Sequence, residues 1–112
     1  MAYDEDLAFR IRAVVAGERG VTEKRMFGGL AFLINGNMAV SASGQGGLLL
    51  RVDPAQGEAL LKEPCARPFE MRGREMSGWL RVDTAKISDD EEFRRWVRHG
   101  ASYARSLPPK KR

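Results

Sequence analysis

The residues that could carry chemistry in this chain of 112 residues are few and far apart. Cys65 and His99 are its only cysteine and its only histidine, too few soft ligands for a structural zinc site. A lone cysteine forms no intrachain disulfide, and we interpret Cys65 as a chance thiol; the alternatives are an intermolecular disulfide or a redox sensor, which the flanking charges in EPCARP do not support. His99 has no serine, cysteine or paired aspartate at the spacing of a catalytic motif. We therefore expect a chain that is not an enzyme and that holds no metal, nucleotide or other cofactor.

A glycine-rich stretch, RMFGGLAFLINGNMAV at residues 25–40, is the part of the sequence most like a ligand-binding motif. A phosphate-binding loop places such glycines between a strand and a helix and usually ends in lysine followed by serine or threonine. Here Gly28 and Gly29 are followed by strand-like residues, and no helix directs its dipole at an anion. We interpret the pair as a bend or bulge between two strands, and the cluster SGQGG at residues 43–47 as a loop.

Two aspartates occupy matching places in a short internal echo, LRVDPA at residues 50–55 and LRVDTA at residues 80–85. A pair of carboxylates could perform acid and base chemistry. The local sequence favours another use, because Asp53 precedes Pro54, a typical first residue of a helix, and Asp83 precedes the short segment TAKI. Neither aspartate has a histidine or lysine beside it, so we interpret both as caps.

The sequence predicts three helices that would position these residues. Residues 4–16 have Asp4 as a cap and an apolar face, and residues 54–62 form a second helix after Asp53. The final helix starts with Ser88 and Glu91 at capping-box spacing. The apolar face of the first helix contains Leu7, Ile11, Val14 and Val15, and that of the last contains Phe93, Trp96, Val97, Gly100, Ala104 and Leu107.

Strand-like segments fill the space between the helices. Asn35 and Gly36, the dipeptide most typical of a type I′ turn, join two of them into a hairpin. The expected strands are residues 22–26, 30–34, 38–42, 47–52, 69–71 and 76–82. The order of one helix, three or four strands, a helix, two strands and a helix predicts an α+β fold. We expect two layers, with a mostly antiparallel sheet and the helices on one of its faces.

Alternation along two strands predicts a candidate partner surface. Leu48, Leu50 and Val52 would face the core, as would Leu80 and Val82. The residues between them would then share the opposite face, and these are Leu49, Arg51, Trp79 and Arg81. Large apolar residues beside arginines are enriched at protein interfaces. The alternatives are that loops or the tail cover this face, or that Trp79 is a core residue in a reversed register.

Charge and hydropathy bound the remaining possibilities. The net charge is +4, and removing the three basic residues of the ending PPKKR leaves 16 basic against 15 acidic residues. We expect a single domain over residues 1–107 and a flexible basic tail over residues 108–112. Arg95, Arg98 and Arg105 could contact nucleic acid or form a solvated helix face. No apolar run is long enough to span a membrane and the start, MAYDEDL, is acidic, so we expect a cytoplasmic protein.

Several segments together resemble one family. RMFGGLAFLINGNMAV, LLLRVDP, RPF followed by MSGWLRVD, and a last helix with a tryptophan and the ending YARSLP resemble the N-terminal domain of the TfoX/Sxy family of bacterial competence regulators. The resemblance runs from Tyr3 to Pro109. It implies a two-layer fold like that of secretion chaperones and a transcription-linked role with the cyclic-AMP receptor protein. It supplies no catalytic residues. The family's full-length regulators also have a C-terminal domain, whereas the resemblance here covers only the N-terminal one. We therefore expect a stand-alone N-terminal domain.

Two functions of different classes follow. The first is a regulatory adaptor that binds a protein partner or a second copy of itself, without a small-molecule substrate. The second is a nucleic-acid-associated protein that uses surface arginines and the basic tail. Proteins that bind single strands tend to present several stacking aromatic residues among basic ones, whereas here Phe93 and Trp96 are expected in the core and only Trp79 could be an exposed platform. We therefore favour the adaptor.

Overall fold

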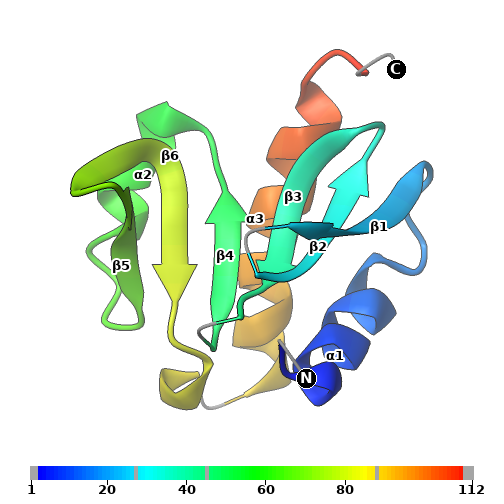
Figure 1. The fold of residues 1–112 in the computed structure, drawn as a ribbon, viewed down its shortest axis with the longest axis horizontal. Coiled ribbons are helices and arrows are strands. Elements are labelled where there is room, and N and C mark those ends of the chain that lie inside the picture. Colours follow the sequence, from blue (N-terminus) through cyan, green and yellow to red (C-terminus); the bar gives the residue numbers. More distant parts are fainter. Residues whose placement is uncertain (1–2, 27, 45, 88, 110–112) are drawn as a thin grey trace.

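The structure, a computed structural model, describes residues 3–26, 28–44, 46–87 and 89–109. It confirms the α+β prediction (Figure 1). The elements in chain order are α1 (Glu5–Val15), β1 (Val21–Met26), β2 (Gly29–Ile34), β3 (Asn37–Ala42), β4 (Leu48–Arg51), α2 (Pro54–Leu60), β5 (Ala66–Met71), β6 (Arg74–Val82), the short 3-10 helix η1 (Thr84–Lys86) and α3 (Asp90–Ser106).

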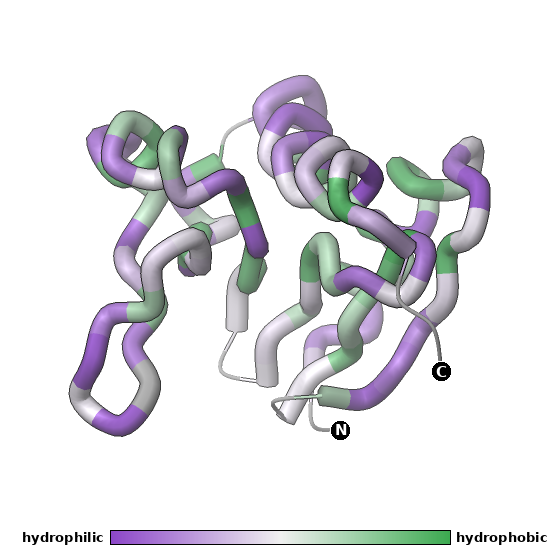
Figure 2. The backbone as a smooth tube through the Cα atoms, turned by 90° about the horizontal axis from the view of Figure 1, so that it is seen from above, coloured by the Kyte–Doolittle hydropathy of each residue, from purple (hydrophilic) through white to green (hydrophobic). Residues whose placement is uncertain are grey.

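All neighbouring strands of the sheet are antiparallel. In the described part of the chain six strands lie in the order β1-β2-β3-β4-β6-β5, so β4 and β6 are neighbours although α2 and β5 separate them in sequence. The pairing of β5 with β6 forms a hairpin that reaches away from the body and is hydrophilic at its tip (Figure 2). The two edge strands are β1, which is rich in charge, and β5, which contains Pro68; both features discourage pairing with another strand.

The main core lies between the sheet and the helices. Alternate residues of the strands join side chains from α1, α2 and α3 in it, and Trp96 at its centre has no exposed surface. Helix α3 crosses so close to β3 that a Cβ atom added at Gly100 would overlap the carbonyl oxygen of Ala39. Phe93 and Trp96 are buried as predicted, and the helices occupy one face of the sheet.

The glycine-rich stretch turns the chain rather than holding a ligand. Asn35 and Gly36 both have positive φ, 53° and 83°, and Ile34 pairs with Asn37 across them, which confirms a type I′ turn. Gly28 has a φ of 75° in an equally short connection from β1 to β2. The predicted bend is therefore a tight hairpin connection, whose other residue, Phe27, lies outside the described part. The irregularity between β2 and β3 falls later in β2.

The aspartates of the echo are caps. An Asp53 oxygen accepts a hydrogen bond from the amide of Ala55 at 2.9 Å, and an Asp83 oxygen accepts one from Ala85 at 3.1 Å. Because β4 and β6 are antiparallel, the two aspartates lie at opposite ends of the strand pair and form no carboxylate site.

The cap of α3 differs from the prediction. Asp89 caps this helix by accepting from the amide of Glu92 at 2.7 Å. The predicted box of Ser88 and Glu91 is therefore wrong by one residue, and Ser88 itself lies outside the described residues. The carboxylate of Asp89 accepts from the amide three positions after it, as a capping serine hydroxyl does, and it adds a favourable charge at the helix N-terminus.

Candidate functional site

The structure brings the four predicted partner-surface residues together. The register of β4 and β6 places Leu49 opposite Arg81 and Arg51 opposite Trp79. Leu49 and Trp79 belong to a second apolar cluster, made of strand residues and separate from the core beneath the helices. The predicted alternation is therefore confirmed, since Leu48, Leu50, Val52, Leu80 and Val82 all lie in the helix-side core.

The same face is not the open apolar surface that the sequence suggested. Leu49 is only 2% exposed, because it packs with Ala31, Met38 and Phe69. This corrects the prediction that Leu49 lies on an exposed surface. The pleat determines which side of a sheet a residue faces, but the covering of that side depends on neighbouring strands, β2, β3 and β5.

The two arginines of this face pack against aromatic rings. The guanidinium carbon of Arg81 lies 5.5 Å from the centre of the Phe69 ring, and its Nη1 donates a hydrogen bond to Ser43 Oγ at 3.2 Å. Burial lowers the pKa of Arg81, and the like charge of Arg67, directly opposite on β5, lowers it further. Arg51 and Trp79 are half-buried. The four predicted residues thus form a packed patch, with arginines over rings.

Cys65 is an inert thiol in this environment. It is 2% exposed, and its Sγ lies 3.9 Å from a carboxylate oxygen of Glu92. Burial raises the pKa of the Cys65 thiol, and the Glu92 charge raises it further, so the thiol stays protonated near neutral pH.

His99 is half-buried beside Trp96, with their ring centres 6.0 Å apart. Burial and the charge of Arg95 lower the pKa of His99, so its imidazole is neutral near pH 7. Across the residues with described positions, no three histidine, cysteine or acidic side chains gather as metal ligands would.

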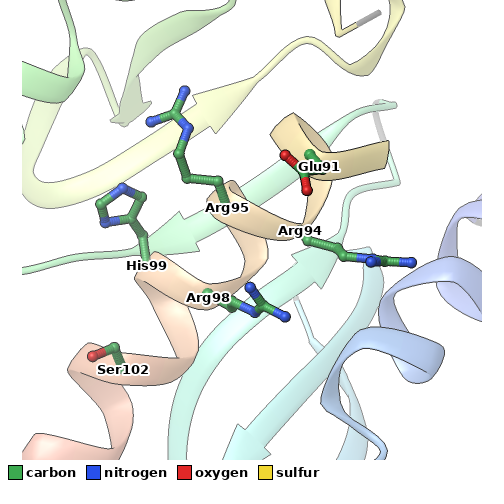
Figure 3. Close-up of a pocket in the computed structure, with 6 residues that line it drawn as sticks. All are labelled: Glu91, Arg94, Arg95, Arg98, His99 and Ser102. Atoms are coloured by element: carbon green, nitrogen blue, oxygen red, sulfur yellow. The ribbon is translucent and has the colours of Figure 1, made fainter. Parts of the chain in front are cut away.

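The outer face of α3 is rich in arginine. Six residues line a depression of about 520 Å³ there: Glu91, Arg94, Arg95, Arg98, His99 and Ser102. Their side chains do not converge on one point (Figure 3). Arg94 and Arg98 extend toward the side on which α1 lies, whereas Arg95 and His99 extend to the other side of the helix. The arrangement is a charged helix face rather than a closed anion pocket.

A second depression, of about 330 Å³, lies between α1 and α3. We call it the α1–α3 groove, and its lining residues are Phe9, Arg10, Ala13, Val14, Asp90, Phe93, Arg94 and Arg98. Phe9 is 68% exposed, a large value for an aromatic side chain. The sequence reading missed this site because Phe9 falls outside the apolar face of α1. An aromatic residue on the polar face of an amphipathic helix was the available signal.

Some arginines near the groove form ion pairs within the domain, and others do not. Arg10 lies 3.3 Å from Asp90, and Arg95 lies 3.5 Å from Glu63. Arg94 and Arg98 take part in none of the ion pairs formed among the described residues, and both are exposed. Positive charge is thus concentrated on one wall of the α1–α3 groove.

Together these features define a small α+β domain, an antiparallel sheet covered by helices on one face, with a mixed apolar and basic groove on the helix side. The chain belongs to the TfoX N-terminal domain family, whose model matches residues 13–104. Neither the curated proteins nor the solved structures contain a match to it. No helix within the described ranges combines the length and the apolar character that a membrane span requires.

Proposed function

We propose that this domain is a non-enzymatic regulatory adaptor, which binds another protein in the cytoplasm as part of transcription control, the role that the resemblance to the TfoX/Sxy competence regulators implies. The observation that carries the proposal is the exposure of Phe9 beside two exposed arginines. Covering a phenylalanine side chain contributes roughly 1.5–3 kcal/mol, which is a strong reason for such a residue to be buried in a complex. Aromatic residues and arginines are also the types most enriched at interface centres.

The environments of the reactive groups support the non-enzymatic part of the proposal. The Cys65 thiol is buried and protonated, and the neutral His99 lies against Trp96. Asp53 and Asp83 are engaged as caps at opposite ends of two strands. Among the described residues, the side-chain hydrogen bonds of Cys65, Asp53 and Asp83 go to Glu92, Ala55 and Ala85, and none joins two of these four groups.

Site-specific photo-crosslinking in cells tests the adaptor proposal. A photoreactive phenylalanine analogue at position 9 should capture a distinct protein band, to be identified by mass spectrometry. The same analogue at Glu58, an exposed residue of α2, is the matched control. A homodimer would appear as a crosslink of the chain to itself. Capture that is equal at both positions, or absent at position 9, would contradict the proposal.

Nucleic-acid binding is the second candidate, and the basic face of α3 favours it. Arg94, Arg95 and Arg98 lie on this face, and Arg105, farther along the helix, pairs with Glu18. The acidic residues at the start of α3, including Asp90 and Glu91, would repel phosphates at that end of the helix. A gel-shift titration over a range of salt concentrations separates the candidates, because phosphate contacts weaken steeply as salt rises.

A further inference from the structure

We infer that the α1–α3 groove docks an acidic amphipathic segment of the partner protein, one that presents apolar side chains to Phe9 and carboxylates to Arg94 and Arg98. The inference rests on the proposed function, since it names the chemistry of the segment that an adaptor would bind. Two neighbouring helices, from opposite ends of the chain, build the site.

The groove has two walls of different character. Phe9 and Ala13 are one helical turn apart on α1 and form the apolar wall with Val14. Arg94 and Arg98 are one turn apart on α3 and form the basic wall. Both arginines extend toward the α1 side (Figure 3). A ligand in the groove therefore meets apolar surface on one side and two positive charges on the other.

Arg10 also lines the groove, and it already has partners within the domain. Its guanidinium carbon lies 4.1 Å above the centre of the Phe93 ring, and its Nη2 lies 3.3 Å from Asp90. Arg10 therefore already has a carboxylate and an aromatic partner, which leaves Arg94 and Arg98 as the cations that a ligand can engage. This contact also keeps Phe93 buried, so Phe9 is the aromatic residue that the groove presents.

The charges in the basic wall favour an anionic ligand. Arg94 and Arg98 are four positions apart on one helix, a spacing at which like charges repel. A carboxylate between them would offset this repulsion and form charge-assisted hydrogen bonds with planar guanidinium donors. The groove is too small for a folded domain but accommodates a few side chains, as expected for one face of a short helix or extended segment.

A protein segment fits these walls better than nucleic acid does. Phosphates and peptide carboxylates would gain alike from the basic wall, and both would meet the carboxylate of Asp90 in the lining, so the apolar wall is what separates the two ligands. The apolar wall, with Ala13 and Val14 behind Phe9, matches aliphatic side chains rather than a sugar-phosphate backbone. An acidic amphipathic segment satisfies both walls at once.

The test uses a synthetic helical peptide of about 14 residues with leucines on one face and glutamates beside them. A peptide with lysine in place of each glutamate and a single-stranded oligonucleotide serve as comparison probes. Binding is measured by fluorescence anisotropy, and the binding surface is mapped by amide chemical shifts. The variants are Phe9→Ser, the pair Arg94→Glu with Arg98→Glu, and the control pair Lys62→Glu with Arg74→Glu, which changes the net charge equally at remote exposed sites.

We expect saturable binding of the glutamate peptide, with shifts centred on α1 and α3. Phe9→Ser and the Arg94/Arg98 pair should each weaken it by about tenfold, whereas the control pair changes it by less than about threefold. All substituted residues are exposed, so unchanged thermal melts verify that each variant is folded.

Each other outcome overturns the inference. If the lysine peptide binds as tightly as the glutamate peptide, charge does not select the ligand. If neither peptide binds saturably, the groove is not a peptide site. Oligonucleotide binding that depends on Arg94 and Arg98 but not on Phe9 identifies a nucleic-acid surface instead. A dimer in analytical ultracentrifugation that Phe9→Ser dissociates makes a second copy the occupant. If peptide binding fails while position 9 still crosslinks to a protein in cells, the inference is wrong and the proposed function stands.

Discussion

Arg51 on β4 lies directly opposite Trp79 on β6, with its guanidinium carbon 5.7 Å from the centre of the indole ring. The same carbon lies 5.7 Å from the Tyr103 ring, which belongs to α3 on the other face of the sheet. The contact is possible because β3 and β4 pair only over Val40–Ala42 and Leu48–Leu50, and diverge next to Arg51 (Figure 1). One arginine thus connects the strand cluster to the helix layer.

Replacing Arg51 with alanine should lower the free energy of unfolding by about 1–2 kcal/mol, because two cation–π contacts and the packing of the side chain are lost together. Urea unfolding followed by tryptophan fluorescence measures the change. Arg74→Ala, at an exposed position of β6, is the control and should leave stability within about 0.5 kcal/mol of the parent. Equal effects of the two substitutions would show that the Arg51 contacts contribute nothing.

Leu49 and Phe9 should behave in opposite ways, although both are large apolar residues. Leu49→Ala creates a cavity in the strand cluster and should cost about 2–5 kcal/mol. Phe9→Ala removes an exposed ring and should change stability by less than about 0.5 kcal/mol. Chemical denaturation of the two variants side by side checks this. A loss of stability well below this range for Leu49→Ala would mean that the strand cluster is loosely packed.

Two glycine-to-alanine changes inside helices should have opposite signs. At Gly57 a Cβ atom meets nothing within 4 Å, so alanine should raise stability by about 0.5–1 kcal/mol through its helix propensity. At Gly100 the new methyl group would overlap the Ala39 carbonyl, which forces α3 away from β3 and outweighs that gain. Thermal melts of both variants provide the measurement, and a stabilised Gly100→Ala protein would rule out the close crossing.

The type I′ turn depends on Gly36. Valine there must adopt a φ near 83°, a left-handed conformation that costs roughly 1–2 kcal/mol and more for a β-branched residue. Gly17→Val is the control, since a Cβ atom at Gly17 has open space and its φ lies outside the positive range. The melting temperature should fall clearly for Gly36→Val and little for the control. Similar melts would contradict the turn assignment.

The pairing of Glu23 with Arg12 makes stability depend on acid pH. Arg12 Nε and Nη2 donate to the Glu23 carboxylate at 2.6 and 2.8 Å, and these hydrogen bonds lower the pKa of Glu23 below its ordinary value of 4.5. The folded protein therefore binds this proton less readily than the unfolded chain does. The contribution is present above the ordinary pKa and disappears as pH falls through the lower folded value.

Glu23→Gln should therefore lose stability near neutral pH and lose less than the parent on acidification. Melting temperatures at about pH 6 and about pH 3 measure both slopes. Glu58→Gln, at an exposed site on α2, serves as the control. Parallel slopes for Glu23→Gln and the parent would show that the pair is not formed in solution.

Local chemistry made much of the fold predictable. The Asn35-Gly36 turn, the caps at Asp53 and Asp83 and the apolar faces of α1 and α3 all depend on residues within a few positions of one another. The one local error, a cap at Ser88 rather than Asp89, arose because either of two adjacent residues can accept from the amide three positions after it, and only packing selects the helix register.

The sequence by itself therefore determined the elements, their order and the faces toward which the residues of β4 and β6 point. Tertiary structure alone decided that β4 pairs with β6, which sets Arg51 against Trp79, and that neighbouring strands bury Leu49. It alone also placed Phe9 beside Arg94, from opposite ends of the chain. Turns, caps and periodicity arise from short-range hydrogen bonds and sterics. Contacts between distant segments depend on how whole layers pack, and no short stretch of sequence encodes that.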